Sequence, residues 1–162
     1  MRNKARMRSG VLMLFLLLTN LPFVQQATAQ NSRDYMNENG IALSGYDVVS
    51  YHQSHEAQRG SKAHASEYKG STFYFVDATN KSAFDEQPDA YLPAFGGYCA
   101  FAMAVGNGKV PSDPKTFKIH NGTLYLFFND YYEGAPFNTI VPWNADELNH
   151  LGNAQANWRA LE

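Results

Sequence analysis

The run Tyr68-Lys69-Gly70-Ser71-Thr72-Phe73-Tyr74-Phe75 decides the fold of this 162-residue chain. It joins two segments predicted as short strands, Ala63–Tyr68 and Thr72–Val76, through the dipeptide Lys69-Gly70. Glycine adopts the positive φ that a tight hairpin turn needs, so the pattern predicts an antiparallel hairpin. Successive side chains of a strand point to opposite faces, so Phe73 and Phe75 share one face.

The residues after this hairpin predict two short helices. Asp77 can accept hydrogen bonds from the free N–H groups of a helix that runs from Ala78 to about Glu86. Pro88 can open a second helix, because a proline at the first helical position loses no hydrogen bond. That helix reaches Tyr91 or Leu92. We expect five aromatic side chains to pack together beneath the hairpin: Tyr68, Phe73, Phe75, Phe84 and Tyr91.

The second half of the chain predicts another hairpin and a terminal helix. Asn121-Gly122 separates the apolar segments Phe117–Ile119 and Thr123–Phe128, which is a strong hairpin signal. The run Asn144-Ala145-Asp146-Glu147 resembles a capping box that opens a helix. An apolar stripe at helical spacing follows it to the C-terminus: Leu148, Leu151, Ala154, Trp158 and Leu161.

The segment Tyr98–Val105 fits a strand or a helix equally well. In both cases Cys99 and Met103 lie on one face. Gly106–Pro114 reads as a loop, and no internal repeat is apparent along the chain. Hairpins and helices follow one another without regular βαβ alternation. The prediction is a small single α+β domain, in which short antiparallel hairpins pack with short helices and a C-terminal helix.

The N-terminal region predicts export. Residues 1–29 carry a basic start, an apolar run and the small-residue site Ala27-Thr28-Ala29, which are the three parts of a signal peptide. We expect cleavage after Ala29 and a periplasmic or secreted product. Residues 30–40 then form a flexible N-terminal segment, and residues 41–162 form the domain. Within the domain, Ile41–Tyr51 is the first ordered piece and His52–Lys62 a loop.

Charge and composition exclude several classes of partner. The signal peptide holds four basic residues and no acid, so its removal changes the formal charge from −2 to −6. A mildly acidic domain argues against nucleic acid as a partner. We expect no membrane insertion after signal cleavage. The chain also shows no nucleophile elbow and no glycine-rich phosphate loop, so the sequence leans toward a protein that is not an enzyme.

The aromatic pattern resembles the YHS domain. The matching residues are the Tyr68–Phe75 run, then Phe84, Pro88 and Tyr91, at the family's spacing. Beyond this core, Gly96-Gly97-Tyr98-Cys99-Ala100 and Asn157-Trp158 resemble a longer, exported branch of YHS-domain proteins. The resemblance implies a YHS-type domain with a C-terminal extension across residues 41–162.

The chain departs from the metal-binding members of that family. Short YHS modules resemble treble-clef metal-binding domains and carry an Asp-Pro-Val-Cys motif with two further cysteines at the strand–helix junction. Here Asp47-Val48-Val49-Ser50 stands for the first motif, and Val76 and Asn80 stand for the junction cysteines. A structural zinc site needs four ligands, commonly thiolates and imidazoles. The family positions of this chain therefore cannot form one.

Cys99 is the single cysteine of the chain and the main candidate for function. Exported proteins normally pair their cysteines, so a lone one is a buried filler, half of an intermolecular bridge or a working thiol. The longer YHS branch includes members with selenocysteine at the corresponding position. That resemblance implies that this position functions as a soft nucleophile or as a soft metal ligand.

The sequence leaves three functions open. The leading one is an exported YHS-type binding module with a site at Cys99, for a small ligand or a soft metal such as a copper ion, with Met103 as second metal ligand. Alternatives are a redox protein, in which Cys99 is the nucleophile and meets an external thiol partner, and a structural or interaction domain with an inert Cys99. Together with Cys99, five residues are predicted to bind a ligand: Gly96, Gly97, Tyr98, Tyr46 and Asp47.

Overall fold

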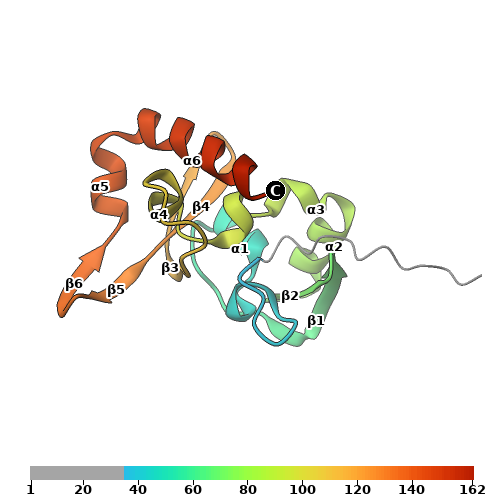
Figure 1. Cartoon of the computed structure of the whole chain (residues 1–162). Coiled ribbons are helices and arrows are strands. Elements are labelled where there is room, and N and C mark those ends of the chain that lie inside the picture. The colour runs from blue at the N-terminus through green and yellow to red at the C-terminus, as the bar shows by residue number, and fades with distance from the viewer. Residues whose placement is uncertain (1–34) are drawn as a thin grey trace, which may run out of the picture.

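The computed structural model describes residues 35–162 and confirms the α+β prediction. The predicted signal peptide and its cleavage site lie outside the described residues. Within them the chain forms two lobes, with the earlier elements on one side and the later elements on the other (Figure 1). Among the described residues, no helix has the length and apolar character needed to cross a membrane.

The first lobe contains the predicted hairpin and its helices. A 3₁₀ turn at Ala42–Gly45 (η1) leads into helix α1, Val48–Gln53, which extends from the predicted ordered piece Ile41–Tyr51 into the predicted loop His52–Lys62. Strands β1 (Ser61–Tyr68) and β2 (Ser71–Phe75) pair antiparallel. Helices α2 (Ala78–Glu86) and α3 (Pro88–Tyr91) follow, and Asp77 caps α2 as predicted.

The second lobe contains the second hairpin, an additional hairpin and the terminal helix. The turn η2 (Ala94–Gly97) precedes α4 (Ala100–Ala104), so the ambiguous segment at Cys99 is a helix. Strands β3 (Asp113–His120) and β4 (Thr123–Phe127) form the predicted pair. Four elements complete the lobe: β5 (Asn129–Tyr132), β6 (Ala135–Asn138), α5 (Ile140–Ala145) and α6 (Glu147–Leu161).

The two lobes are two copies of one structural unit, which corrects the expectation of no internal repeat. In β1–β2, Ser61 pairs with Phe75, and in β3–β4, Asp113 pairs with Phe127. Every paired residue of the second hairpin is numbered 52 positions after its counterpart, and both hairpins are irregular at the same place. We call the copies the first unit (residues 41–92) and the second unit (residues 93–161).

The turn before each hairpin repeats with the same offset. Leu43 has φ 49° and ψ 38°, and its counterpart Phe95 has φ 54° and ψ 35°. Both residues thus lie in the left-handed region, which non-glycine residues seldom adopt. The residue that precedes α1, Asp47, donates its N–H to the Gln58 carbonyl at 2.8 Å, and Cys99 donates to the Val110 carbonyl at 2.9 Å.

After the hairpins the offset grows from 52 to 59, because the second unit contains the β5–β6 hairpin as an insertion. The helices beyond the insertion correspond again. Gln87 separates α2 from α3 with φ −143° and ψ 64°, and Asp146 separates α5 from α6 with φ −150° and ψ 56°. The aromatic residue that packs on the hairpin is Phe84 in the first unit and Trp143 in the second.

The first unit has an aromatic core, as predicted. Phe84 lies 4.9 Å from Phe73 and 5.0 Å from Phe75 between ring centroids, and Tyr68 and Tyr91 pack at the edge of the same cluster. Residues 35–40, from the segment expected to be flexible, pack against this core. The ring of Tyr35 meets Phe73 at 5.5 Å and is buried.

The second unit has its own core around Trp143, and α6 covers it. Ala154 is buried there and Leu151 and Trp158 are partly buried, whereas Leu148 and Leu161 are exposed. The predicted stripe is therefore correct in its middle only. The capping-box prediction is wrong in detail, because α6 begins after Asp146 without a side-chain cap. The Asn144 side chain instead accepts a hydrogen bond from Lys118.

Candidate functional site

Cys99 is fully buried and caps the short helix α4. Its Sγ accepts a hydrogen bond from the N–H of Ala102 at 3.4 Å. The turn η2 and the bond to the Val110 carbonyl fix its backbone from both sides. The sulfur is thus held in one place by the backbone of its own unit.

Thr139, a residue from a later part of the second unit, contacts the same sulfur. Its Oγ1 lies 3.3 Å from Cys99 Sγ, although 40 positions separate the two residues. The same hydroxyl donates to the Phe128 carbonyl at 2.9 Å, and the Thr139 N–H donates to that carbonyl as well, at 2.9 Å. Thr139 precedes α5 but makes no side-chain cap bond to it. Among residues 35–162, the partners of its hydroxyl are the sulfur and the Phe128 carbonyl.

A small pocket of about 140 Å³ opens onto Cys99. Its wall is largely apolar. Four side chains of the wall carry a polar atom: Cys99, Asn107, Tyr132 and Thr139. Its volume approaches that of an engineered apolar protein cavity that binds benzene. The apolar and aromatic lining consists of Phe101, Ala102, Val110, Phe128, Tyr132 and Phe137.

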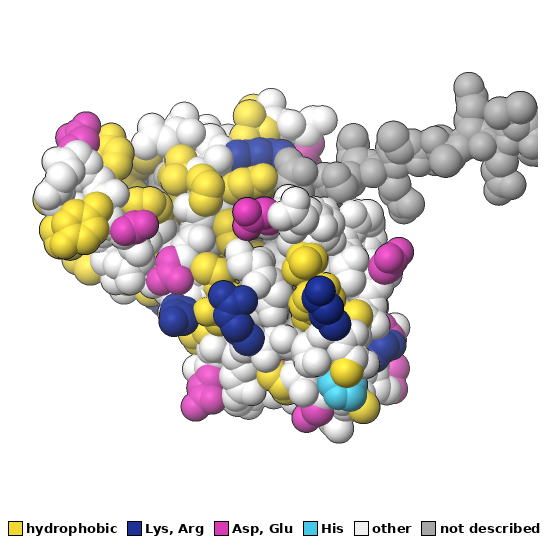
Figure 2. Space-filling model, turned by 90° about the horizontal axis from the view of Figure 1, so that it is seen from below, with side chains coloured by type: hydrophobic (Ala, Val, Ile, Leu, Met, Phe, Trp, Pro, Cys, Tyr) yellow, Lys and Arg dark blue, Asp and Glu magenta, His cyan; other side chains and the backbone are white. Residues whose placement is uncertain are grey.

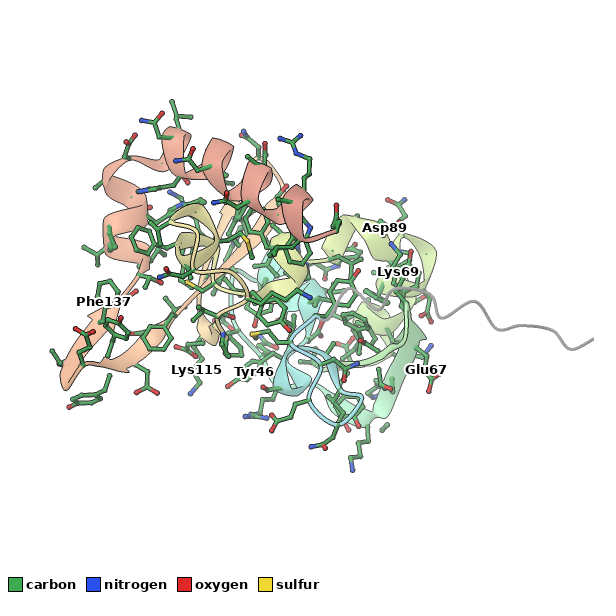
Figure 3. The ribbon with its side chains drawn as sticks, in the orientation of Figure 1. Tyr46, Glu67, Lys69, Asp89, Lys115 and Phe137 are labelled. Atoms are coloured by element: carbon green, nitrogen blue, oxygen red, sulfur yellow. The ribbon has the colours of Figure 1, made fainter. Side chains whose placement is uncertain are left out.

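The inserted β5–β6 hairpin supplies one side of this pocket. It projects from the end of the second lobe, where Figure 3 places Phe137. The rings of Tyr132 and Phe137 meet across the two strands at a centroid distance of 6.0 Å. Glu133 and Gly134 both have positive φ, as the turn of a two-residue hairpin requires. The first unit lacks this insertion.

The position of Cys99 is occupied by Asp47 in the first unit. The Asp47 carboxylate is fully buried and accepts hydrogen bonds on both oxygens. Oδ1 accepts from the N–H groups of Val49 and Ser50, at 2.8 and 3.3 Å. Oδ2 accepts from the Val76 N–H at 2.9 Å and from the Asn80 side chain at 2.7 Å. Ser50 and Asn80 correspond to Ala102 and Thr139 of the second unit.

The structure therefore separates the predicted ligand-binding residues. Cys99 lines the small pocket, but Asp47 lies in the first unit, where protein donors surround its carboxylate. Tyr46 is buried beside it and carries the Arg59 guanidinium over its ring at 4.7 Å. Tyr98 holds the equivalent place in the second unit, with the Lys109 ammonium 5.5 Å from its ring centroid.

Met103 lies apart from the pocket that Cys99 lines. It is fully buried in the core around Trp143 and is not part of the pocket wall. Within residues 35–162 there is no cluster of three or more His, Cys, Asp or Glu side chains that could hold a metal ion. The arrangement around Cys99 thus offers one sulfur and one hydroxyl in an apolar setting.

Gly97 serves packing in this structure. Its φ is +80°, and a Cβ there would lie 2.6 Å from Leu43 Cδ2. We expect Gly97→Ala to lower the free energy of unfolding by about 2–3 kcal/mol, from backbone strain and overpacking together. Gly106→Ala is the matched control, because Gly106 has φ +83° and open space around it. Equal denaturation midpoints for the two variants would show that the contact with Leu43 carries no cost.

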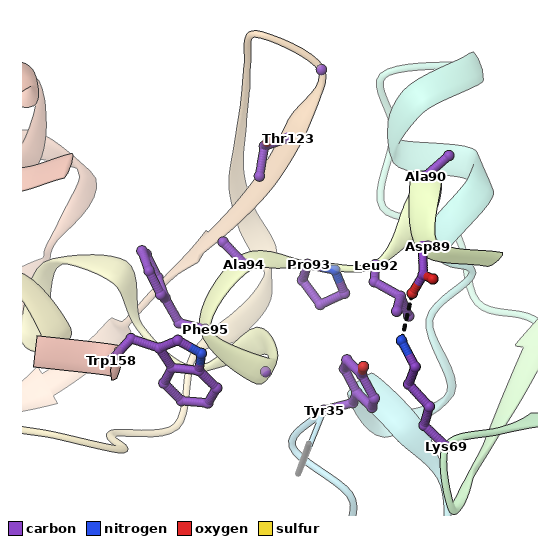
Figure 4. A pocket seen from close by; sticks show the side chains of 12 residues that line it. Tyr35, Lys69, Asp89, Ala90, Leu92, Pro93, Ala94, Phe95, Thr123 and Trp158 are labelled. Carbon is purple, nitrogen blue, oxygen red and sulfur yellow. Dashed lines mark hydrogen bonds and ion pairs between the residues drawn. The ribbon is translucent and has the colours of Figure 1, made fainter. Parts of the chain in front are cut away.

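A second, larger cavity of about 630 Å³ lies where the units meet (Figure 4). Gly96 lines it, together with the rings of Tyr35, Phe95 and Trp158. An ion pair closes one edge, with Lys69 Nζ 2.6 Å from Asp89 Oδ1. The hydrogen bond to Asp89 raises the pKa of Lys69, which keeps this lysine charged. Of the predicted site residues, Gly96 alone lines this cavity.

Cys99 could be predicted from the sequence, whereas its surroundings could not. Thr139, Phe128 and the β5–β6 hairpin are not among the predicted site residues. The hairpin has only a weak signal, since Glu133-Gly134 follows the strand-forming pair Tyr131-Tyr132 but precedes Ala135-Pro136, and a proline disfavours strand. Comparison of the chain with protein-family models, with curated proteins and with solved structures finds no match.

Proposed function

We propose that this protein is a binding module of the YHS type that holds a small, apolar, thiol-reactive ligand at Cys99. The observation that carries the proposal is the pocket of about 140 Å³ that Cys99 lines. Its aromatic walls favour an uncharged group about the size of a benzene ring. We assign the decisive contact to the sulfur, because the Cys99 thiol, as a thiolate, is the strongest nucleophile among the side chains that line the pocket.

A specific observation also supports the redox alternative. Two groups that can donate hydrogen bonds, the Ala102 N–H and the Thr139 hydroxyl, meet the sulfur, and donors stabilise a thiolate. A thiolate can attack an external disulfide, form a mixed disulfide with Cys99 and release the other half as a thiolate. The chain has no second cysteine to resolve that product, so the resolving thiol must come from another molecule.

The test of the binding function is the rate at which two matched reagents alkylate Cys99. Iodoacetamide and iodoacetate have similar size and differ in charge. We expect the folded protein to react with the neutral reagent much faster than with the anionic one, and benzene to slow the reaction by filling the pocket. The unfolded protein should show a smaller preference. Cys99→Ser controls for labelling elsewhere.

Two outcomes would overturn this function. If iodoacetamide leaves the folded protein unlabelled while the unfolded protein reacts, Cys99 is inert. If the protein instead binds one Cu(I), and both Cys99→Ser and Met103→Leu weaken that binding, the soft-metal function is favoured over an organic ligand. Met103→Leu conserves volume and usually costs less than about 1.5 kcal/mol, so the fold persists in that control.

A further inference from the structure

The hydroxyl of Thr139 stands between two acceptors but has one proton. Oγ1 lies 3.3 Å from Cys99 Sγ and 2.9 Å from the Phe128 carbonyl oxygen. Thr139 is buried, with 3% of its surface exposed, and these two atoms are the hydrogen-bond partners of its hydroxyl among the described residues. The hydroxyl proton can point to the carbonyl or to the sulfur, but not to both at once.

The protonation state of Cys99 decides between these two arrangements. A neutral thiol can donate its own proton to Oγ1, and the hydroxyl then donates to the Phe128 carbonyl. When the thiol loses its proton to solvent, the sulfur becomes an acceptor only. The hydroxyl can then rotate and donate to the sulfur. This rotation strands no buried acceptor, because the Phe128 carbonyl keeps the hydrogen bond from the Thr139 N–H at 2.9 Å.

The first unit shows the same position with a fixed donor. Asn80, the counterpart of Thr139, donates from its amide to Asp47 at 2.7 Å. An amide N–H₂ cannot become an acceptor, and the Asp47 carboxylate accepts three further hydrogen bonds. In the second unit the Thr139 hydroxyl replaces the Asn80 amide. A hydroxyl can accept a hydrogen bond from a neutral thiol or donate one to a thiolate.

We propose that Thr139 is a positioning residue that stabilises the thiolate of Cys99 by turning its hydroxyl from the Phe128 carbonyl to the sulfur. This inference rests on the proposed function, in which Cys99 reacts through its sulfur. The pocket wall contains no charged side chain, and Tyr132 is its one titratable group besides Cys99. The Thr139 hydroxyl and the Ala102 N–H are therefore the groups in contact with the sulfur that can favour its anionic form.

The test is the pH profile of Cys99 alkylation by iodoacetamide in full-length Thr139→Val and Thr139→Ser variants. Valine keeps the shape of threonine and removes the hydroxyl, whereas serine keeps the hydroxyl. We expect Thr139→Val to react about tenfold more slowly below the high-pH plateau, because one hydrogen bond to a charged group is lost. The plateau rate itself should not change, and Thr139→Ser should follow the wild type.

The outcomes separate this inference from the function on which it rests. A reactive Cys99 with superimposable profiles for wild type and Thr139→Val would overturn the role of Thr139 and leave the thiol function standing. An inert Cys99 in the folded wild type would remove both. Thermal denaturation of each variant tests for a general loosening of the fold, which would raise the alkylation rate at every pH. The hydroxyl does not cap α5, so its removal leaves that helix terminus as it is.

Discussion

Replacement of Phe84 by alanine is expected to lower the free energy of unfolding by about 3–5 kcal/mol. The residue has 1% of its surface exposed and lies at the centre of the first core. Its ring contacts three other rings, at centroid distances of 5.8 Å to Tyr68, 4.9 Å to Phe73 and 5.0 Å to Phe75. These come from both strands of the hairpin, so the variant removes the side chain that joins the sheet to α2.

Phe137→Ala is the control for this prediction. Phe137 has the same side chain but is 37% exposed on the β5–β6 hairpin, where other apolar side chains also gather at the surface (Figure 2). Its removal should cost little, because a partly exposed ring loses less burial. Urea denaturation of both variants measures the difference. A midpoint for Phe84→Ala that equals that of the wild type would show that the aromatic cluster is not the core of the first unit.

The hairpins and their aromatic faces could be predicted because the signals are local. Lys69-Gly70 and Asn121-Gly122 each set a turn, and alternation on the flanking residues sets the buried face. Helix α1 was not predicted, because Val48 and Val49 are β-branched and disfavour helix by themselves. What starts the helix is Asp47, whose carboxylate is held by Val76 and Asn80 from a distant part of the chain. A single sequence does not show that contact.

The repeat is not recognisable in the sequence, because few corresponding residues of the two units are identical. Between residues 41–76 and their counterparts, five positions carry the same residue: Ala42, Gly45, Tyr46, Gly70 and Phe75. These are turn and core positions, where backbone conformation or packing limits the choice. Asp47 and Cys99 occupy corresponding positions of the two units but differ in chemistry. In the sequence, Asp47 therefore resembles an acidic turn residue and Cys99 a free thiol. Their equivalence is visible only through the shared hydrogen-bond geometry.

The second large effect is expected at Asp47. Asp47→Ala should lower the free energy of unfolding by about 4 kcal/mol, because three buried donors and one partly buried donor lose their acceptor. Each unsatisfied buried group costs about 1–3 kcal/mol before relaxation. Two of these donors begin α1, and the others, from Val76 and Asn80, tie β2 and α2 to it. The variant therefore loosens three elements at once. Chemical denaturation followed by circular dichroism measures the loss.

Two further variants identify the cause. Asp77→Ala removes another aspartate that caps a helix, but Asp77 is exposed and accepts one hydrogen bond at the cap, from Asn80 at 2.8 Å. It should cost about 1 kcal/mol. Asp47→Asn keeps one acceptor oxygen but turns an N–H₂ group toward the donors of Val76 and Asn80, so its cost should approach that of alanine. If Asp47→Ala costs no more than Asp77→Ala, the position does not anchor an anion. The interpretation of Cys99 as the counterpart of a buried, hydrogen-bonded carboxylate would then lose its physical basis.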